Sequence, residues 1–275
     1  MMRPGHPKLM LAAYTITLIA ILSALLPLAW ILMISLKPQR EAFALPPSLF
    51  FDPIFDNYAA VWRKEAFRAA LLNSTIVSAL GVAMAVSAAI PAAYALNRIP
   101  FRGKRAILIW LIIAYLLPEF LFIVPMYSLY QFLGLYDTRF GLAVVYQVFA
   151  MPFSVWMIQS FFLDVPRELD DAARIDGCGT LGTLRYVYLP MAAPGIAATC
   201  ILTGIWMWNE LAIALALTFR DAQTITVAVA SFRGYTAIEW GPMTAASIIS
   251  ILPMLLAAAF LQRYIVKGLT LGAVK

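Results

Sequence analysis

The chain has 275 residues, of which 63% are hydrophobic and only 12% are charged. Its mean hydropathy of +0.85 is far above that of soluble domains and excludes a water-soluble globular fold. The net charge of +6 forms no basic stripe interleaved with aromatic residues, so we expect no nucleic-acid partner. The one histidine, His6, and the two separated cysteines, Cys178 and Cys200, argue against a catalytic triad, a metal centre or a disulfide framework.

Long apolar stretches recur along the chain. A transmembrane helix needs roughly 20 consecutive apolar residues, and the first stretch is also too long for the core of a cleaved signal peptide. We therefore predict an all-α membrane protein with six transmembrane helices, at residues 9–36, 69–97, 106–130, 141–163, 191–219 and 242–261.

We expect proline kinks in four of the predicted spans. Membrane helices tolerate such kinks where neighbouring groups satisfy the freed carbonyls, and kinked helices around a cavity suit a transporter. The expected kinks are at Pro118, Pro125, Pro152, Pro194 and Pro253. In the first outer loop, residues 54–72 are predicted to form an interfacial helix that carries Trp62 and Phe67.

The connection at residues 97–105 carries four cations and no anion, which places it in the cytoplasm by the positive-inside bias. With six spans, both termini and the segment 164–190 then lie on the same side. We predict two parts of the chain. Residues 1–68 hold the N-terminal tail, the first span and an extracytoplasmic loop, and residues 69–275 hold the core domain of five spans.

A charged segment at residues 164–190 separates two apolar runs. It is predicted to contain a short acid-rich helix from Glu168 to Asp176, followed by a turn at Gly177. Two small residues, Ala172 and Ala173, would let another protein approach this helix closely, and the alternative is an ordinary solvated loop. The residues predicted to couple to that protein are Glu168, Asp170, Asp171, Ala172, Ala173, Asp176, Gly177, Leu189 and Pro190.

This segment resembles the EAA loop of permease subunits in bacterial ABC importers. The family pattern is Glu-Ala-Ala, three residues, Gly, nine residues, Ile, one residue and Leu-Pro. Here Asp171 begins the triplet, Gly177 occupies the glycine position, Val187 replaces isoleucine, and Leu189 and Pro190 close the pattern. Aspartate is one methylene shorter than glutamate, which could weaken a salt link to an ATPase.

Further strings look like the carbohydrate-uptake permeases of the same binding-protein-dependent family. They occur at residues 35–38, 73–74, 92–96, 133–138, 208–210 and 262–270. The resemblance implies the ABC type I importer permease fold and a multi-pass protein of a bacterial plasma or inner membrane. It also implies a second homologous permease, cytoplasmic ATP-binding subunits that hold ATP and Mg, and an extracytoplasmic solute-binding protein. No cofactor and no catalysis are expected on this chain.

Polar residues inside apolar spans are costly and usually face a cavity or a partner. Aromatic faces beside amides and carboxylates suit sugar binding. The predicted pathway residues are Glu119, Gln147, Gln159, Trp206, Trp208, Asn209 and Glu210. Hydrogen bonds between subunits, helix-end capping or an interfacial aromatic belt would explain the same residues equally well.

Two other classes of membrane protein fit the sequence less well. A secondary transporter would show an internal repeat, and none is evident in the sequence. A membrane-embedded enzyme would need a nucleophile or metal constellation, which the spans do not offer. Sugars, polyols and glycerophospho-compounds all stay open as the transported solute, and the sugar is favoured by the resemblance.

Overall fold

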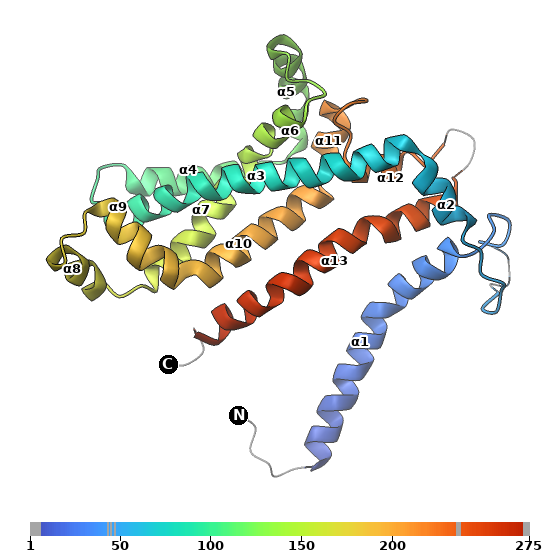
Figure 1. Ribbon diagram of the computed structural model, residues 1–275, viewed down its shortest axis with the longest axis horizontal. Coiled ribbons are helices and arrows are strands. Elements are labelled where there is room, and N and C mark those ends of the chain that lie inside the picture. The colour runs from blue at the N-terminus through green and yellow to red at the C-terminus, as the bar shows by residue number, and fades with distance from the viewer. Residues whose placement is uncertain (1–6, 43, 45, 47, 235–237, 272–275) are drawn as a thin grey trace. The chain divides into compact units, whose positions relative to one another are not determined.

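The computed structural model describes residues 7–42, 44, 46, 48–234 and 238–271. Within these ranges the chain is helical, and its one β-feature is an isolated bridge between Arg233 and Ile238. Four helical runs are long and apolar enough to cross a membrane (Figure 1). They are α1 (Pro7–Ser35), α3 (Glu65–Arg98), the run Thr180–Asn209 and the first part of α13 (Trp240–Leu271). His6, Arg3 and Lys275 lie outside the described residues.

Two further spans are bent pairs of helices. Helix α4 (Lys104–Leu116) meets α5 (Phe120–Leu133) at 93°, and α6 (Arg139–Val145) meets α7 (Gln147–Leu163) at 51°. If each pair is one span, the described part of the chain has up to six spans by length and composition, which agrees with the predicted number. The all-helical membrane fold is confirmed.

The predicted kinks coincide only partly with the breaks. Pro118 lies at the break between α4 and α5, but the other four prolines lie inside helices that continue through them. A proline inside a helix removes one backbone hydrogen bond without ending the helix if neighbouring groups compensate. The break at Tyr146, between α6 and α7, and the break at Glu210 have no proline and were not predicted.

The fifth span was misplaced in the prediction at 191–219. The structure begins it with α9 (Thr180–Thr183), passes through the π-helix η1 (Leu184–Tyr188) and continues as α10 (Leu189–Asn209). A separate short helix, α11 (Ala212–Leu217), then follows. The error has a physical cause: buried Leu184 and Tyr188 carry helical structure into the charged segment, and the chain turns at Glu210.

The predicted interfacial helix at 54–72 is also wrong as a single element. Helix α2 (Asp56–Arg63) ends at Arg63, the next residue, Lys64, has an extended backbone, and the second span begins immediately afterwards in α3. Trp62 is half exposed on α2, whereas Phe67 is buried on α3. The two rings therefore do not share one interfacial face.

The chain divides into two compact units, of which the first comprises residues 1–65 and 229–251. Within it, the Asn57 amide nitrogen donates to the carbonyls of Ser35 and Lys37, both at 2.9 Å. The Gln39 amide nitrogen donates to the Ile238 carbonyl at 2.7 Å. These bonds tie α2 to the end of α1, and the chain after α1 to the start of α13. Nothing in the sequence pattern alone indicated them.

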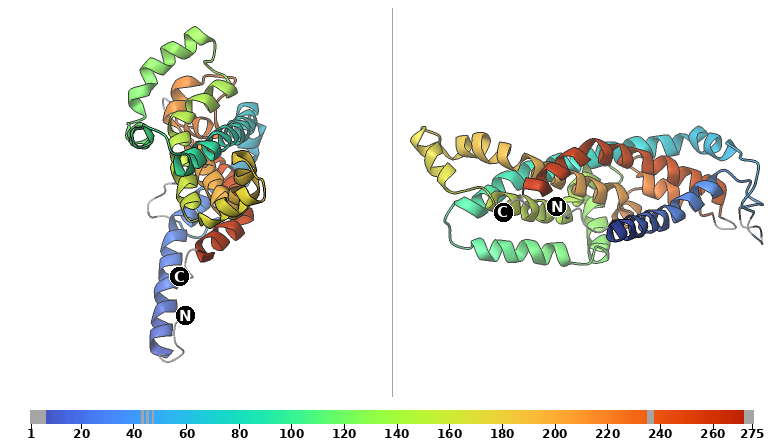
Figure 2. Two further views of the ribbon diagram at one scale, coloured as in Figure 1. Left: turned by 90° about the vertical axis from the view of Figure 1, so that its left-hand side faces the viewer. Right: turned by 90° about the horizontal axis from the view of Figure 1, so that it is seen from below.

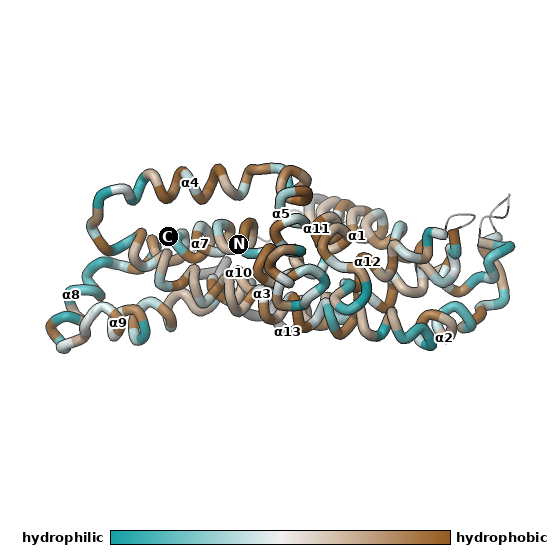
Figure 3. The backbone as a smooth tube through the Cα atoms, turned by 90° about the horizontal axis from the view of Figure 1, so that it is seen from above, coloured by the Kyte–Doolittle hydropathy of each residue, from teal (hydrophilic) through white to brown (hydrophobic). Residues whose placement is uncertain are grey.

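The second unit comprises residues 66–228 and 252–275. In it, α7 packs against both α4 and α10 (Figure 2). A Cβ atom added at Gly195 of α10 would lie 2.1 Å from the Phe161 ring, so these two helices approach through a glycine. Hydrophobic residues line α4, while hydrophilic residues gather around α8 (Glu168–Ile175) at one end of this unit (Figure 3).

At another place in this unit, the Asp137 side chain organises a turn that is remote in sequence. Its two carboxylate oxygens accept hydrogen bonds from four consecutive backbone N–H groups, at residues 219–222, with distances of 2.9–3.0 Å. The Asn73 amide nitrogen donates to the carbonyls of Asp221 and Gln223, each at 3.0 Å. The turn after α11 is thereby fixed to α3 and to the connection before α6.

Replacement of Asp137 by Asn should destabilise the protein in a pH-dependent way. Burial raises the pKa of Asp137, but the four N–H donors outweigh burial and hold the pKa below its usual value. The carboxylate therefore stabilises the fold above the unfolded-state pKa of about 3.9, and this contribution is lost as the pH falls through the lower folded-state pKa. We expect Asp137→Asn to cost about 1–3 kcal/mol at neutral pH.

Thermal unfolding of the purified protein, measured from pH 7 downward, checks this prediction. The difference in Tm between wild type and Asp137→Asn should shrink only below pH about 4. Asp52→Asn, at an exposed position, is the control and should leave Tm unchanged. A difference that is equal at every pH would contradict the charge-based account.

Candidate functional site

The acid-rich helix predicted in the charged segment is present as α8, which ends one residue earlier than expected. Three acids, Glu168, Asp170 and Asp171, occupy its first turn, where negative charge is favourable to the helix dipole. Gly177 follows the helix with φ +81°, and the Cys178 N–H bonds back to the Ala173 carbonyl at 2.8 Å. This left-handed turn confirms the predicted turn at Gly177.

The two alanines of the motif face in different directions. Ala172 is exposed, but Ala173 is only 6% exposed and packs into its own chain. The expectation that both alanines lie on the docking face is therefore corrected for Ala173. Neighbouring residues on a helix are separated by about 100°, so one of an adjacent pair commonly turns inward.

Two exposed apolar side chains of this segment were not predicted from the sequence. Ile175, on α8, is 86% exposed, and Leu181, on α9, is 77% exposed. The available signal was an isolated large aliphatic residue in a charged segment, where no core-facing pattern accounts for it. Of the other predicted coupling residues, Glu168, Asp171, Asp176 and Gly177 are exposed. Leu189 and Pro190 form the first turn of α10.

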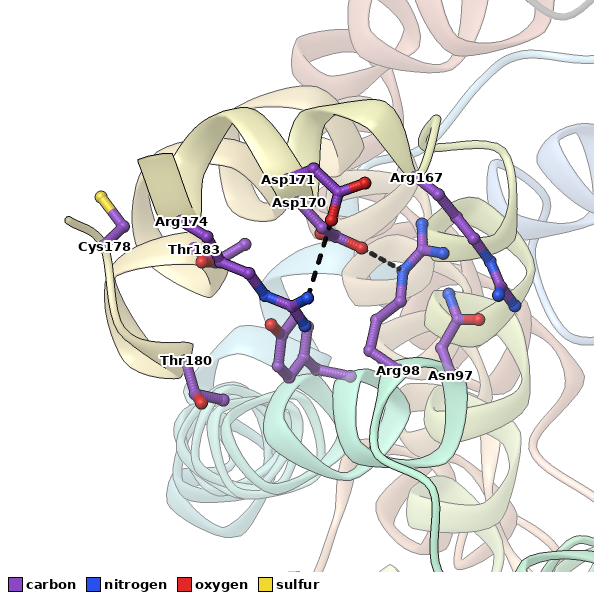
Figure 4. Close-up of a pocket in the computed structure, with 10 residues that line it drawn as sticks. Asn97, Arg98, Arg167, Asp170, Asp171, Arg174, Cys178, Thr180 and Thr183 are labelled. Carbon is purple, nitrogen blue, oxygen red and sulfur yellow. Dashed lines mark ion pairs between the residues drawn. The ribbon is translucent and has the colours of Figure 1, made fainter. Parts of the chain in front are cut away.

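Asp170 turns inward and makes an ion pair with Arg98, the last residue of α3. The distance from its Oδ2 to Arg98 Nε is 3.2 Å, and Tyr188 of η1 donates its hydroxyl to the same oxygen at 3.1 Å. Arg98 also donates to the Tyr188 hydroxyl and, through Nη2, to the Val165 carbonyl at 2.6 Å. Figure 4 shows Arg98 and Asp170 meeting between α3 and α8.

A polar cleft of about 320 Å³ adjoins this ion pair (Figure 4). Arg167, Arg174 and Thr180 contribute to its wall, and Arg174 pairs with Asp171 at 3.6 Å where both side chains are exposed. Two buried atoms that line it, Asn97 Nδ2 and Asp170 Oδ1, have no hydrogen-bond partner within the described chain. The cleft is therefore suited to polar groups from outside the chain.

Replacement of Gly177 by Ala tests the turn after α8. A left-handed backbone costs a residue with a Cβ atom about 1–2 kcal/mol, although no neighbouring atom lies within 4 Å of the added Cβ. We expect Gly177→Ala to lower Tm and Gly179→Ala to leave it unchanged, because Gly179 has an ordinary extended backbone and equally open surroundings. Equal Tm values for the two variants in thermal unfolding would contradict this reading.

A second pocket forms where two helix breaks approach each other. Its volume is about 440 Å³, and it lies between the start of α5 and the end of α10. Four of the seven predicted pathway residues, from segments far apart in sequence, line it together. The lining residues are Glu119, Leu202, Ile205, Trp206, Asn209, Glu210, Leu211 and Ala212.

Glu210 contributes to this pocket mainly as a structural cap. Its Oε1 accepts the Ile213 N–H at 2.7 Å, and its Oε2 accepts the Ala214 N–H at 3.0 Å. The same Oε2 accepts the Tyr146 hydroxyl at 2.9 Å, and Glu210 is only 6% exposed. Of the readings left open by the sequence, helix-end capping is the one that this geometry matches for Glu210.

The remaining predicted pathway residues do not join the pocket. Gln147 donates its amide to the carbonyls of Ala143 and Gly81, at 2.8 and 3.2 Å. Trp208 is 6% exposed, and Gln159 lies on α7 away from the pocket walls.

Trp206, by contrast, is one of the four predicted residues that line the pocket. Its ring packs edge-to-face on Tyr146, with the ring centroids 5.5 Å apart.

The same arrangement of helices occurs in a solved membrane transporter. The crystal structure of a bacterial ABC transporter involved in the import of the acidic polysaccharide alginate contains a chain that matches with a TM-score of 0.75. The match covers 95% of this chain and 99% of that chain at 21% identity, so it establishes the fold alone. Apolar spans, bent helices and a polar end segment thus form the fold of a membrane chain of this bacterial ABC transporter.

The amino-acid sequence identifies the protein family to which the chain belongs. A family model described as binding-protein-dependent transport system inner membrane component matches residues 81–271. The chain is 36% identical over 258 residues to the trehalose transport system permease protein of Mycobacterium tuberculosis. The aligned residues cover 92% of this chain and 93% of the relative. It is 34% identical over 255 residues to the trehalose/maltose transport system permease protein of Thermococcus litoralis, with 91% of each chain covered.

The chain therefore belongs to the family of binding-protein-dependent transport system inner membrane components. It is a multi-pass membrane protein of the ABC importer permease class.

Proposed function

We propose that this chain is one half of the transmembrane pathway of an ATP-driven importer for a sugar or sugar-like solute. The solute would be delivered by an extracytoplasmic binding protein, and residues 164–190 would couple the pathway to cytoplasmic ATPases. The names of the two relatives, as trehalose and trehalose/maltose transport system permease proteins, support the solute class. The exposed face of α8 supports the coupling role.

The observation that carries the coupling role is the composition of that face. Ala172 offers a small contact, Ile175 offers an unburied aliphatic side chain, and Glu168 and Asp171 add negative charge. An exposed apolar residue surrounded by polar ones is typical of an interface centre, where its burial supplies binding energy. A basic or polar cleft in the ATPase would complement such a surface.

The proposed orientation places α8 and the connection at residues 97–105 in the cytoplasm. That connection has four cations and no anion, and it lies next to α8 because Arg98 bonds to both Val165 and Asp170. With six spans, both termini would then be cytoplasmic as well. The turn held by Asp137 would lie on the extracytoplasmic side.

The proposed partners follow from the same assignment. A second homologous permease would complete the pathway within the lipid bilayer, and ATP with Mg would be bound by the ATPase subunits. This chain would hold no cofactor and catalyse no reaction. In the pathway, Glu119 and Asn209 would present polar groups to the solute beside Trp206, while Glu210 would hold the pocket wall through its capping bonds.

Replacement of Ile175 by Glu tests the coupling surface. Full burial of an Ile side chain is worth about 1.5–3 kcal/mol, so the change should weaken ATPase binding by roughly tenfold or more. Co-purification of the ATPase with the tagged permease measures the loss, and Ala172→Glu and Gly177→Asp should act in the same direction. The control is Ala60→Glu, an exposed position on α2.

The permease pair should stay assembled in each of these variants. Retention of the ATPase and of solute uptake in vesicles by Ile175→Glu and Ala172→Glu together would show that α8 is not the coupling element.

The pocket residues are tested by uptake kinetics. Loss of a hydrogen bond to a polar solute costs about 0.5–1.5 kcal/mol, so Glu119→Gln and Asn209→Ala should each lower uptake efficiency by roughly two- to tenfold. Gln159→Ala, outside the pocket on α7, should have no effect. Competition by trehalose, a polyol and a glycerophospho-compound in the same assay assigns the solute class. Unchanged uptake in both pocket variants would place the solute path elsewhere.

A further inference from the structure

We propose that Arg98 is a positioning residue that transmits movement of α8 to the membrane spans. The inference rests on the proposed coupling role of α8 and names the connection through which that role acts. Arg98 is the last residue of α3, and its partners come from three other places in the fold. They are Asp170 of α8, Tyr188 at the start of the fifth span, and the Val165 carbonyl after α7.

The geometry makes Arg98 the centre of a fixed junction. Its guanidinium group bonds to Asp170 at 3.2 Å and to the Val165 carbonyl at 2.6 Å, and it lies 5.2 Å from the centre of the Tyr188 ring. The side chains of Arg98 and Asp170 are only 10% and 14% exposed. An arginine can hold several partners in a fixed planar geometry, so these elements are held at defined positions relative to α3.

The Tyr188 ring extends this junction into the spans. It packs edge-to-face against Tyr94 of α3 and Phe162 of α7, with centroids 5.0 and 5.1 Å apart. Tyr188 itself is fully buried. Its hydroxyl meets both members of the ion pair, while its ring contacts two spans. A force applied to α8 through Asp170 therefore reaches three spans through one pair of side chains.

The ion pair gives α8 a side-chain link to α3 in addition to its covalent connections. On one side α8 is followed by Gly177 in a left-handed turn and then by Gly179, and no atom lies within 4 Å of a Cβ atom added at either position. On the other side, the chain from α7 to α8 is a short segment that begins at Asp164. Without the ion pair, α8 would keep its packing against α9 and η1 and the Tyr188–Asp170 hydrogen bond, but it would lose its ion pair with the end of α3.

The test compares solute uptake with ATP hydrolysis in vesicles that hold the complete transporter. For Arg98→Gln we expect normal co-purification of the ATPase and near-normal hydrolysis, but a fall of about fivefold or more in solute imported per ATP hydrolysed. Arg98→Lys should recover part of this ratio, because lysine keeps the charge but not the planar set of donors. Arg102→Gln, at an exposed position of the same basic connection, is the matched control and should keep the wild-type ratio.

Removal of one charge leaves the other buried without its partner, so Arg98→Gln could also impair folding. The double variant Arg98→Gln/Asp170→Asn removes both charges and should show the same loss of coupling in an assembled complex. If uptake and hydrolysis fall in proportion, or if the double variant is lost from the membrane, the ion pair is a folding element and the proposal is overturned.

The failure of the proposed function gives a different result. In that case Ile175→Glu and Ala172→Glu would retain the ATPase and uptake, whatever the outcome at Arg98. A wild-type import ratio in Arg98→Gln, together with loss of the ATPase in Ile175→Glu, would overturn the transmission role alone.

Discussion

One buried hydrogen bond joins two helix breaks and supports the organisation of the second unit. The Tyr146 hydroxyl, at the bend between α6 and α7, donates to the Glu210 carboxylate, at the end of α10, over 2.9 Å. In an apolar medium, each backbone N–H or C=O freed by a break must find a partner within the protein. Glu210 meets that need for two N–H groups at the start of α11. The breaks at Tyr146 and Glu210 are thus mutually dependent, and the hydrogen bond between them also fixes Glu210 in the wall of the pocket at the end of α10.

This constraint separates the polar residues of the spans into two kinds. Glu210 and Gln147 satisfy groups of their own chain, and neither is exposed. Glu119, which directly precedes α5, and Asn209, which ends α10, lie at the pocket surface, although the Asn209 amide nitrogen also donates to the Ile205 carbonyl at 2.8 Å. Moving a polar side chain from water into a membrane span costs free energy, so a polar residue in a span is expected to have a role. Only the partners of that residue in the folded chain show which role it has.

The number of spans was predictable because it depends on the length of apolar stretches, which is a local property of the sequence. The acid-rich helix and its glycine turn were predictable for the same reason, and α8 begins at the expected Glu168. The breaks at Tyr146 and Glu210 were not, because each depends on a hydrogen bond between residues 64 positions apart. The inward direction of Ala173 and the ion pair of Arg98 with Asp170 likewise depend on packing between distant segments.

The π-helix η1 explains why the spacing between Gly177 and the Leu189-Pro190 pair should be strict. Residues 184–188 form one wide turn that brings Tyr188 under Asp170, and α10 continues from it without interruption. Deletion of a single residue here would rotate everything on one side of the turn by about 100° relative to the other. Evolution can therefore vary the side chains of this segment far more readily than its length, so insertions and deletions should be filtered out while substitutions accumulate.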